Sequence, residues 1–409
     1  MFVQLTAFML RKKKMNEKIY LDNSATTYAD PRVKREIDSY FTDNYGNPGS
    51  FNTFGFKAKE AVDDSREKIS KILHCNPDEI IFSGSGTESN NLAIKGVARE
   101  LKLKQGKNHI VTTKVEHPSV LETCKYLEKY EGFDVTYLGV DKYGLISGEQ
   151  VKDAITDKTA LVTVIYGNNE IGSINPIAVI GKITREKKVY FHTDACQAAG
   201  SLNVNVNDLN VDLMTLNGSK IYGPKGIGVL YVRKGTRIQP IIHGGGQENN
   251  LRSGTENVPG IVGFARALEI CQDIRDSEVE RLTLLREKLI KNVLQKVDNV
   301  RLNGHPIKRL PFNVSFSFKD IEAESLILLL DENGICVSAG SACSSKSLDP
   351  SYVVLNLCVS KNYARGTIRI SLGRSTTEKD IDKVIEVLPK LVSQIRSMNV
   401  VSKNGKTRN

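Results

Sequence analysis

The chain of 409 residues lacks the features of several protein classes. Its seven cysteines are few, odd in number and without a Cys-x-x-Cys pair, which argues against a secreted disulfide framework and favours a reducing, cytoplasmic setting. No run approaches the roughly 20 apolar residues needed to span a bilayer, so we expect no membrane association. The six histidines are scattered and form no His-Glu-x-x-His motif, so we expect no metal site. The 32 glycines have no fixed period, which excludes a collagen-like chain.

Positive charge is concentrated at the two ends of the chain. The 57 basic and 47 acidic residues give a net charge of +10, of which residues 1–20 and 391–409 each supply +4. The body therefore carries only +2, which argues against a basic groove for nucleic acid. In residues 1–14 the apolar stretch precedes the basic one, the reverse of a secretory signal. We interpret residues 1–17 as a disordered basic extension, with Met15 as an alternative start, and residues 398–409 as a flexible basic tail.

Short apolar runs alternate with helical patterns over the first half of the chain. Strands are expected at residues 79–82, 108–114, 134–140, 159–166, 189–195, 211–217 and 228–233, and helices at 56–73, 87–100 and 119–130. This alternation predicts an α/β fold with a mainly parallel sheet covered by helices on both faces. A long helical pattern follows at about 260–297. A smaller α/β unit comes next, with strands at 313–318, 335–338 and 367–373, and helices at 322–334 and near 377–397.

The segment Ser-Gly-Ser-Gly-Thr-Glu-Ser at 83–89 lies between an expected strand and an expected helix. Its glycines allow close approach of the backbone, and the following helix N-terminus offers free N–H groups and a positive dipole end to a phosphate. Thr87 adds a hydroxyl donor. The segment is not a Walker A loop, and Ser89 stands where a dinucleotide-binding loop has its third glycine. A tight structural turn remains the alternative.

Two further residues give this segment a chemical context. Asp194 ends an apolar strand, where ligands bind in open α/β sheets. Lys220 follows another strand and precedes a Gly/Pro turn, a setting in which a lysine can be desolvated and reactive. A phosphate cradle, a strand-end carboxylate and a later lysine are what a pyridoxal phosphate enzyme requires.

At this point the sequence resembles cysteine desulfurases of the NifS/IscS type, in the class V aminotransferase group, over about residues 18–395. The matching segments are YLDNSATT (20–27), GNPGS (46–50), SGSGTESNN (83–91), EHPSV (116–120), NNEIG (168–172), DACQ (194–197), KIYGPKGIG (220–228), HGGGQE (243–248), RSGTEN (252–257), SACSS (341–345) and IRISLGR (368–374). Together these motifs are highly specific, although each alone is not.

The resemblance implies pyridoxal 5'-phosphate as the cofactor. Lys220 looks like the Schiff-base lysine and Asp194 like the partner of the pyridinium nitrogen. His117 would stack on the ring and take part in proton transfer; the alternative is a capped loop histidine before Pro118. The other implied cofactor contacts are Gly86, Thr87, Asn169, Gln197, Asn217, Ser219 and Thr255, the last reaching the phosphate of the other subunit of a homodimer.

The resemblance also implies the reaction, in which L-cysteine gives L-alanine and a persulfide on Cys343. The neighbours of Cys343 are small and polar, which suits a mobile loop at 338–350. Asn169 and Arg369 would bind the substrate carboxylate. The sulfur acceptor would be an iron–sulfur scaffold or a tRNA thiolation enzyme. The other six cysteines are expected to be packed in the core: Cys75, Cys124, Cys196, Cys271, Cys336 and Cys358.

The expected architecture is that of fold type I pyridoxal phosphate enzymes. A large domain at 30–275 carries a seven-stranded, mainly parallel sheet, and residues 18–29 with 276–397 form a small domain. The chain departs from its relatives at Asn217-Gly218-Ser219, where Ser-x-His is common, and at Asn52, where His is common; we expect weaker cofactor retention. Alternatives are a selenocysteine lyase, an aminotransferase, a dinucleotide-dependent dehydrogenase or a catalytically weakened scaffold.

Overall fold

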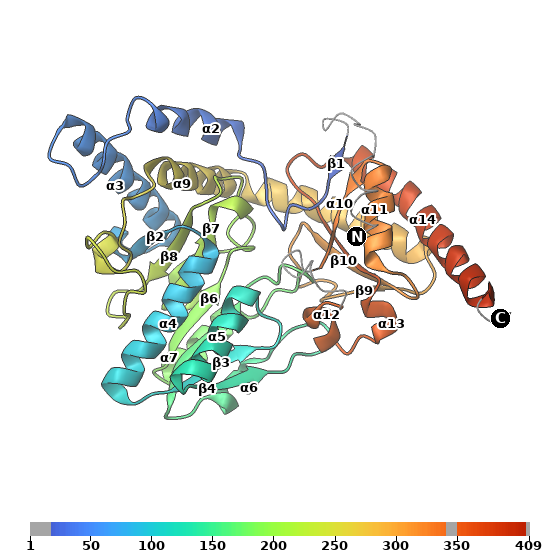
Figure 1. The fold of residues 1–409 in the computed structure, drawn as a ribbon, viewed down its shortest axis with the longest axis horizontal. Coiled ribbons are helices and arrows are strands. Elements are labelled where there is room, and N and C mark those ends of the chain that lie inside the picture. Colours follow the sequence, from blue (N-terminus) through green and yellow to red (C-terminus); the bar gives the residue numbers. More distant parts are fainter. Residues whose placement is uncertain (1–17, 341–349, 406–409) are drawn as a thin grey trace. The chain divides into compact units, whose positions relative to one another are not determined.

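The computed structural model describes residues 18–340 and 350–405, and the chain divides into two compact units (Figure 1). The large unit comprises Thr26–Asn169 and Ser173–Ser277. The small unit comprises Glu170–Gly172, the described residues before Thr26 and those from Glu278 onward. Among the described residues, no helix combines the length and the apolarity that a bilayer crossing requires.

The large unit is built on a seven-stranded sheet, which confirms the predicted α/β fold. In spatial order its strands are β2 (Ile80–Ser83), β8 (Gly228–Val232), β7 (Leu213–Asn217), β6 (Tyr190–Asp194), β5 (Thr159–Ile165), β3 (His109–Thr113) and β4 (Asp134–Leu138). All neighbouring pairs are parallel except the two pairs that β8 makes, which are antiparallel. Since β8 runs against both β7 and β2, those two strands end at the same edge as β6.

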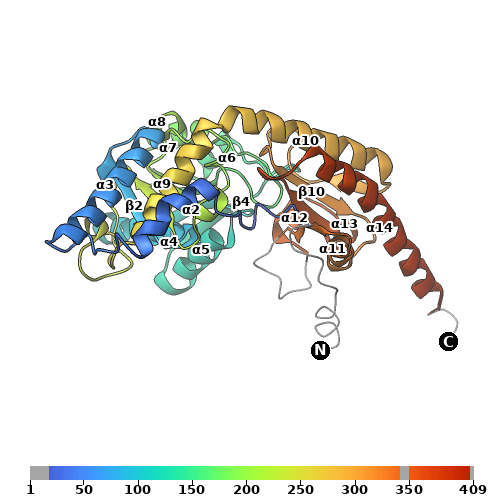
Figure 2. The same cartoon turned by 90° about the horizontal axis from the view of Figure 1, so that it is seen from above.

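Helices cover both faces of this sheet, because successive strand residues point to opposite faces. The helices are α2 (Pro31–Ile37), α3 (Thr53–Leu73), α4 (Gly86–Gln105), α5 (Pro118–Glu131), α6 (Gly148–Ala154), α7 (Ile177–Glu186), α8 (Val206–Leu209) and α9 (Val258–Asp273). Val229 and Tyr231 face a core shared with α3, α7 and α9, whereas Leu230 faces a core shared with α4 and α5. Figure 2 shows α4 and α5 on the opposite side of the large unit from α7 and α8. Short 3₁₀ turns are η3 (Asp38–Phe41), η4 (Pro77–Glu79), η5 (Gly218–Lys220) and η6 (Glu248–Asn250).

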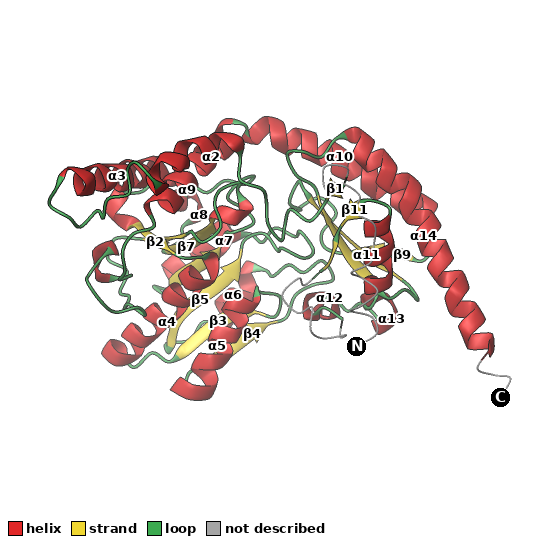
Figure 3. Cartoon of the chain, turned by 45° about the horizontal axis from the view of Figure 1, so that its top comes forward, coloured by secondary structure: helices red, strands yellow, loops and turns green. Residues whose placement is uncertain are grey.

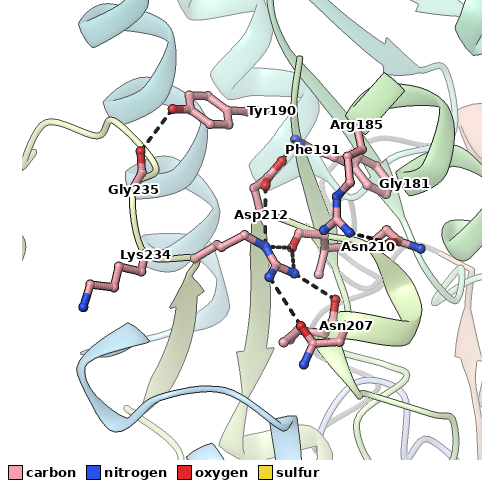
Figure 4. A network of polar contacts seen from close by, with 12 residues as sticks. Gly181, Arg185, Tyr190, Phe191, Asn207, Asn210, Asp212, Lys234 and Gly235 are labelled. Atoms are coloured by element: carbon pink, nitrogen blue, oxygen red, sulfur yellow. Dashed lines mark hydrogen bonds and ion pairs between the residues drawn. The ribbon is translucent and has the colours of Figure 1, made fainter. Parts of the chain in front are cut away.

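Backbone-directed polar contacts close the amino edge of the sheet (Figure 4). The Asp212 carboxylate, just before β7, accepts a hydrogen bond from the Phe191 N–H at 2.9 Å. The Arg233 guanidinium donates to the carbonyl of Val211 at 2.9 Å and to that of Val206 at 3.2 Å. These contacts satisfy backbone groups at the edge opposite to Asp194, so the polar side chains of the amino edge stabilise the fold. The predicted site residues of the large unit lie at the carboxyl edge.

The small unit is a second α/β arrangement (Figure 3). Its four-stranded antiparallel sheet has the order β12 (Ser338–Ala339), β13 (Thr367–Ser371), β10 (Asn313–Phe318), β9 (Val300–Leu302), and a separate parallel pair joins β1 (Ile19–Tyr20) to β11 (Ile335–Cys336). The helices are α10 (Arg275–Lys296), α11 (Ala323–Glu332), α12 (Tyr352–Asn356), α13 (Lys361–Ala364) and α14 (Glu378–Gly405). Side chains of α10, α11 and α14 pack with the strands in one apolar core.

Two expectations from the sequence are wrong. The single helix predicted for residues 260–297 is two helices, α9 and α10, separated at Ile274 (φ −104°, ψ 4°). They serve different cores, and apolar periodicity does not reveal such a change of direction. Helix α14 extends as far as Gly405, into the tail expected to be flexible, and the flexibility of residues 398–409 stays a prediction. Cys358 is exposed rather than packed, because it occupies a turn at φ 57°.

Candidate active site

The predicted site residues of the large unit lie at the carboxyl edge of the sheet. Ser83, Asp194 and Asn217 are the last residues of β2, β6 and β7. Because these three strands run in the same direction, their ends meet at one edge, where open α/β sheets bind ligands. The predicted phosphate loop therefore lies on the same edge as the strand-end carboxylate.

The N-terminus of α4 forms a tight cradle at this edge. A Cβ added to Gly86 would lie 2.7 Å from Sγ of Cys196 and 3.4 Å from Cβ of Asn217, so only glycine fits. The Ser85 hydroxyl caps the helix by accepting from the Glu88 N–H at 3.2 Å. The first N–H groups of an α-helix have no partner within the helix, so Gly86 and the exposed Thr87 present donors at its positive end.

The glycine-rich segments of the chain brace this cradle. The Glu88 carboxylate accepts from the Gly84 N–H at 2.9 Å and from Nε of Arg252 at 2.8 Å. Glu248 accepts from the Phe82 N–H at 2.7 Å and forms an ion pair with Arg66. These charge-assisted bonds attach the segments 243–248 and 252–257 to strand β2 and to the loop that follows it.

Thr255 lies close to the cradle in the large unit. It is exposed and lines a cavity of about 240 Å³ with Gly84, Gly226 and Arg252. Its contact with the phosphate of a second subunit stays a prediction.

Lys220 is held in a short turn next to the cradle. Oδ1 of Asn217 accepts from both the Ser219 N–H at 3.2 Å and the Ser219 hydroxyl at 3.3 Å. The Thr27 N–H donates to the Ser219 carbonyl at 2.9 Å. Asn217 and Ser219 therefore bond to each other and stabilise the turn that presents Lys220. The lysine itself is half-buried.

Asp194 is buried and held through both carboxylate oxygens. Oδ1 accepts from the Cys196 N–H at 3.0 Å, and Oδ2 accepts from Nδ2 of Asn90 at 2.8 Å. The buried Gln197 follows on the same segment. Asn90 was missed by sequence reasoning, although its place one turn beyond Thr87 on the same helix was a usable signal.

His117 both caps α5 and belongs to the site, so the two interpretations of this histidine are compatible. Its Nδ1 accepts from the Ser119 N–H at 3.1 Å and lies 2.7 Å from the Ser119 hydroxyl. Burial lowers the pKa of His117, Asp194 opposes this shift and Lys220 adds to it. The imidazole is therefore favoured in its neutral form, in the same polar neighbourhood as both charged groups.

The preceding residue, Glu116, was also missed. It is fully buried, and Oε1 accepts from the Thr113 hydroxyl at 2.8 Å and from the Ile165 N–H at 3.0 Å. Burial raises the pKa of Glu116 to about 8. The carboxyl group ties the turn before α5 to strand β5, and so positions His117.

The remaining predicted site residues are Arg369, Asn169 and Cys343. Arg369 belongs to the small unit, where its buried guanidinium forms an ion pair with Asp22 at 2.8 Å and donates to the Ser338 hydroxyl at 2.9 Å. Asn169 is half-buried at the last position of the first large-unit segment. Cys343 lies outside the described residues.

The comparisons with known proteins bear on this arrangement. The family model described as aminotransferase class-V matches residues 19–384. The chain belongs to the class-V aminotransferase family. This assignment agrees with the large unit's sheet and with the placement of the polar residues at its carboxyl edge.

Several curated relatives of the chain are described as cysteine desulfurases. "Cysteine desulfurase IscS" of Clostridium botulinum is 50% identical over 387 residues, covering 94% of this chain and 97% of the relative. The protein of the same name from Dictyoglomus turgidum is 47% identical, with the same coverage. Among solved structures, a NifS-like protein aligns with a TM-score of 0.86 at 37% identity, covering 92% of this chain and 99% of that one. A further one, described as SspA in complex with cysteine, has a TM-score of 0.76 at 36% identity, covering 86% of this chain and 98% of that one.

Proposed function

We infer that the protein is a cysteine desulfurase that uses pyridoxal 5'-phosphate. The enzyme removes sulfur from L-cysteine, leaving L-alanine. The observation that carries the assignment is the grouping of the Gly86 cradle, Asp194 and Lys220 in one unit of a chain 50% identical to a curated desulfurase. A dinucleotide-dependent dehydrogenase would leave this grouping unexplained.

The residues present fit the cofactor. The α4 N-terminus and the missing Cβ of Gly86 suit a phosphate, and Asp194 offers a carboxylate at the end of β6. The proposed additional contacts are Thr87, Asn169, Gln197, Asn217, Ser219 and Thr255. When bound, the cofactor supplies an electron sink that stabilises negative charge at the α-carbon of the amino acid.

The chain's own groups then have separate tasks. Lys220 would hold the cofactor covalently through its ε-amino group, and as a free amine it would accept the α-proton of the substrate. Asp194 would keep the ring nitrogen of the cofactor protonated, and the neutral His117 would contact the ring and exchange protons with the substrate. Arg369 and Asn169 orient the substrate carboxylate, for which a guanidinium fork is apt.

Cys343 is the proposed sulfur acceptor within the chain. Its thiolate attacks the substrate sulfur, so an S–S bond forms while the C–S bond breaks. The electron pair of the C–S bond stays with the substrate carbon, which is protonated to give L-alanine. A persulfide remains on Cys343 and is passed to an acceptor protein of iron–sulfur assembly or tRNA thiolation.

Cys343→Ser tests this function, with Cys358→Ser as a matched control, since Cys358 is the exposed cysteine of the described small unit. Visible absorption reports cofactor loading, and sulfide (with a reductant) and alanine are measured after addition of L-cysteine. Cys343→Ser is expected to stay yellow and lose both products, whereas Cys358→Ser keeps both in equal amounts. Full alanine production by Cys343→Ser would refute the nucleophile, and a colourless wild type that cannot be loaded would refute the enzyme class.

We further propose a homodimer. Large apolar side chains are exposed within a short stretch of the large unit: Phe41, Tyr45, Phe51, Phe54 and Phe56. Exposed apolar clusters of this kind mark protein interfaces. The expected result is a mass of twice 45.3 kDa in light scattering, and a monomer for a variant with serine at Phe51 and Phe56.

A further inference from the structure

A chain of hydrogen bonds inside the large unit joins Asp194 to His117. Asn90, in the second turn of α4, places Nδ2 2.8 Å from Oδ2 of Asp194 and 2.8 Å from Oγ of Ser119. Oγ of Ser119 in turn lies 2.7 Å from Nδ1 of His117. Asn90 is 1% exposed, so bulk water does not compete for these bonds. These four residues are called the Asn90 relay below.

The directions of these bonds follow from the available protons. An amide nitrogen carries two protons and accepts none. Both protons of Asn90 are therefore donated, one to Asp194 and one to Ser119. With the amide reversed, its carbonyl oxygen would face a carboxylate oxygen, and two acceptors would meet.

The proton positions at His117 follow next. Since the Ser119 hydroxyl accepts from Asn90, its own proton is available for Nδ1 of His117. The Ser119 backbone N–H points at the same nitrogen from 3.1 Å. Two donors thus meet Nδ1, which must accept, and the single ring proton of the neutral imidazole lies on Nε2.

We propose that Asn90 is a positioning residue that holds the Asp194 carboxylate and, through Ser119, keeps His117 neutral with its proton on Nε2. The catalytic meaning of this tautomer rests on the proposed function, but the hydrogen-bond pattern does not. The charged groups that act on His117 are Asp194 of β6, which favours the imidazolium, and Lys220 of η5, which opposes it. The Asn90 relay acts in the same direction as Lys220 and burial. The Ser119 hydroxyl and the Ser119 N–H both donate to Nδ1 of His117 and so stabilise its unprotonated form.

A purely structural role for Asn90 makes a different prediction. Any truncation of a fully buried side chain lowers the free energy of unfolding, so loss of stability or of turnover does not identify a relay. The pH at which His117 is half protonated (its protonation midpoint) does identify a relay. Without Asn90, the Ser119 hydroxyl is free to turn and accept a proton from Nδ1, which favours the imidazolium.

The experiment uses cofactor-free full-length protein, deuterated and labelled with ¹³C and ¹⁵N at histidine. His117→Gln assigns the His117 signals. In the wild type, Nδ1 is expected to be unprotonated and Nε2 protonated at neutral pH. In Asn90→Ala the midpoint is expected to rise by about one pH unit, because the hydrogen bond that directs the Ser119 hydroxyl proton toward Nδ1 is lost. The control is Asn91→Ala, whose amide donates to the Thr87 carbonyl of its own helix and which leaves the midpoint unchanged.

A second set of variants tests the path through Ser119. In a Ser119→Ala background, Asn90→Ala is expected to add little, because the hydroxyl that transmits the effect is gone. Asn90→Asp serves if Asn90→Ala does not fold, which circular dichroism and thermal melting establish. Its carboxylate accepts the Ser119 proton and so turns the hydroxyl toward accepting from Nδ1, which gives a larger rise.

Each outcome decides one claim. A raised midpoint in Asn90→Ala or Asn90→Asp that vanishes without the Ser119 hydroxyl supports the relay. Folded variants that titrate His117 like the wild type overturn it, as does a wild-type Nδ1 that carries the proton. Failure of the wild type to release sulfide while His117 titrates as expected would overturn the proposed function and leave the relay standing.

Discussion

Gly86→Ala is the most local test of the cofactor cradle. The new Cβ would lie 2.7 Å from Sγ of Cys196, whereas real Cβ atoms essentially never approach a heavy atom within 3.0 Å. Its distance of 3.4 Å to Cβ of Asn217 is an ordinary contact. Gly86 is not among the glycines at positive φ, so the effect comes from space and not from backbone strain.

The magnitude is the balance of two terms. Overpacking of a well-packed site costs about 1–3 kcal/mol, and alanine in place of glycine in a helix recovers at most about 1 kcal/mol. The free energy of unfolding is therefore expected to fall by about 1 kcal/mol. Displacement of the first turn of α4 also weakens its bonds to phosphate. A loss of about 1.4 kcal/mol there raises the cofactor Kd about tenfold.

The assay is a double-mutant cycle with Cys196→Ala, which removes the Sγ atom that Gly86→Ala would meet. Urea unfolding of the cofactor-free protein gives the stabilities, and titration of the absorption spectrum gives the cofactor Kd. The double variant is expected to be more stable than the sum of the single effects predicts, by about 1 kcal/mol or more. Additive effects would refute the steric explanation, and so would an unchanged cofactor Kd in Gly86→Ala.

Three further predictions concern buried or charged groups. Burial lowers the pKa of His192 from 6.5 to about 4, so the unfolded chain takes up this proton first and the free energy of unfolding falls by up to about 3 kcal/mol as pH drops from 6.5 to 4. In His192→Gln the free energy of unfolding should depend less on pH over this range, and an unchanged slope would contradict the assignment to His192. The pH dependence from Glu116 has the opposite sign, because burial raises the pKa of Glu116 from 4.5 to about 8 and the free energy of unfolding falls as pH rises between these values. Glu116→Gln should lessen that fall in the same urea series. An unchanged fall would show that the carboxyl is already ionised in the folded protein. Arg369→Lys loses the guanidinium fork and should raise the KM for L-cysteine about tenfold while the cofactor Kd stays constant; an equal KM would remove Arg369 from substrate binding.

Much of the fold was predictable because it depends on local pattern. The strands of the large unit are continuous apolar runs, since helices cover both faces of the sheet, and their short length distinguishes them from helices. The break at Ile274 was not predictable in this way. Apolar periodicity continues across it, although α9 and α10 contribute to two different cores.

The site shows the same division. Asp194 and Lys220 were predictable because a strand end and a Gly/Pro turn are local features with a known chemical use. Asn90, Ser119 and Glu116 were not, since an asparagine in a helix or a glutamate in a turn is ordinary until its partners are known. Glu116 bonds to Ile165, 49 residues away, and Asn90 to Asp194, 104 residues away.

The sequence by itself determined the alternation of elements and the sheet of the large unit, because these depend on side-chain type and short-range spacing, and it supplied the candidate residues for the chemistry. Only the tertiary structure decided the surroundings of those residues. It showed that Cys196 packs against Gly86 and that the Asn90 relay joins Asp194 to His117. The physical reason is that hydrogen-bond direction and close packing are properties of pairs of groups, and the chain brings these pairs together only when the strands align in the sheet.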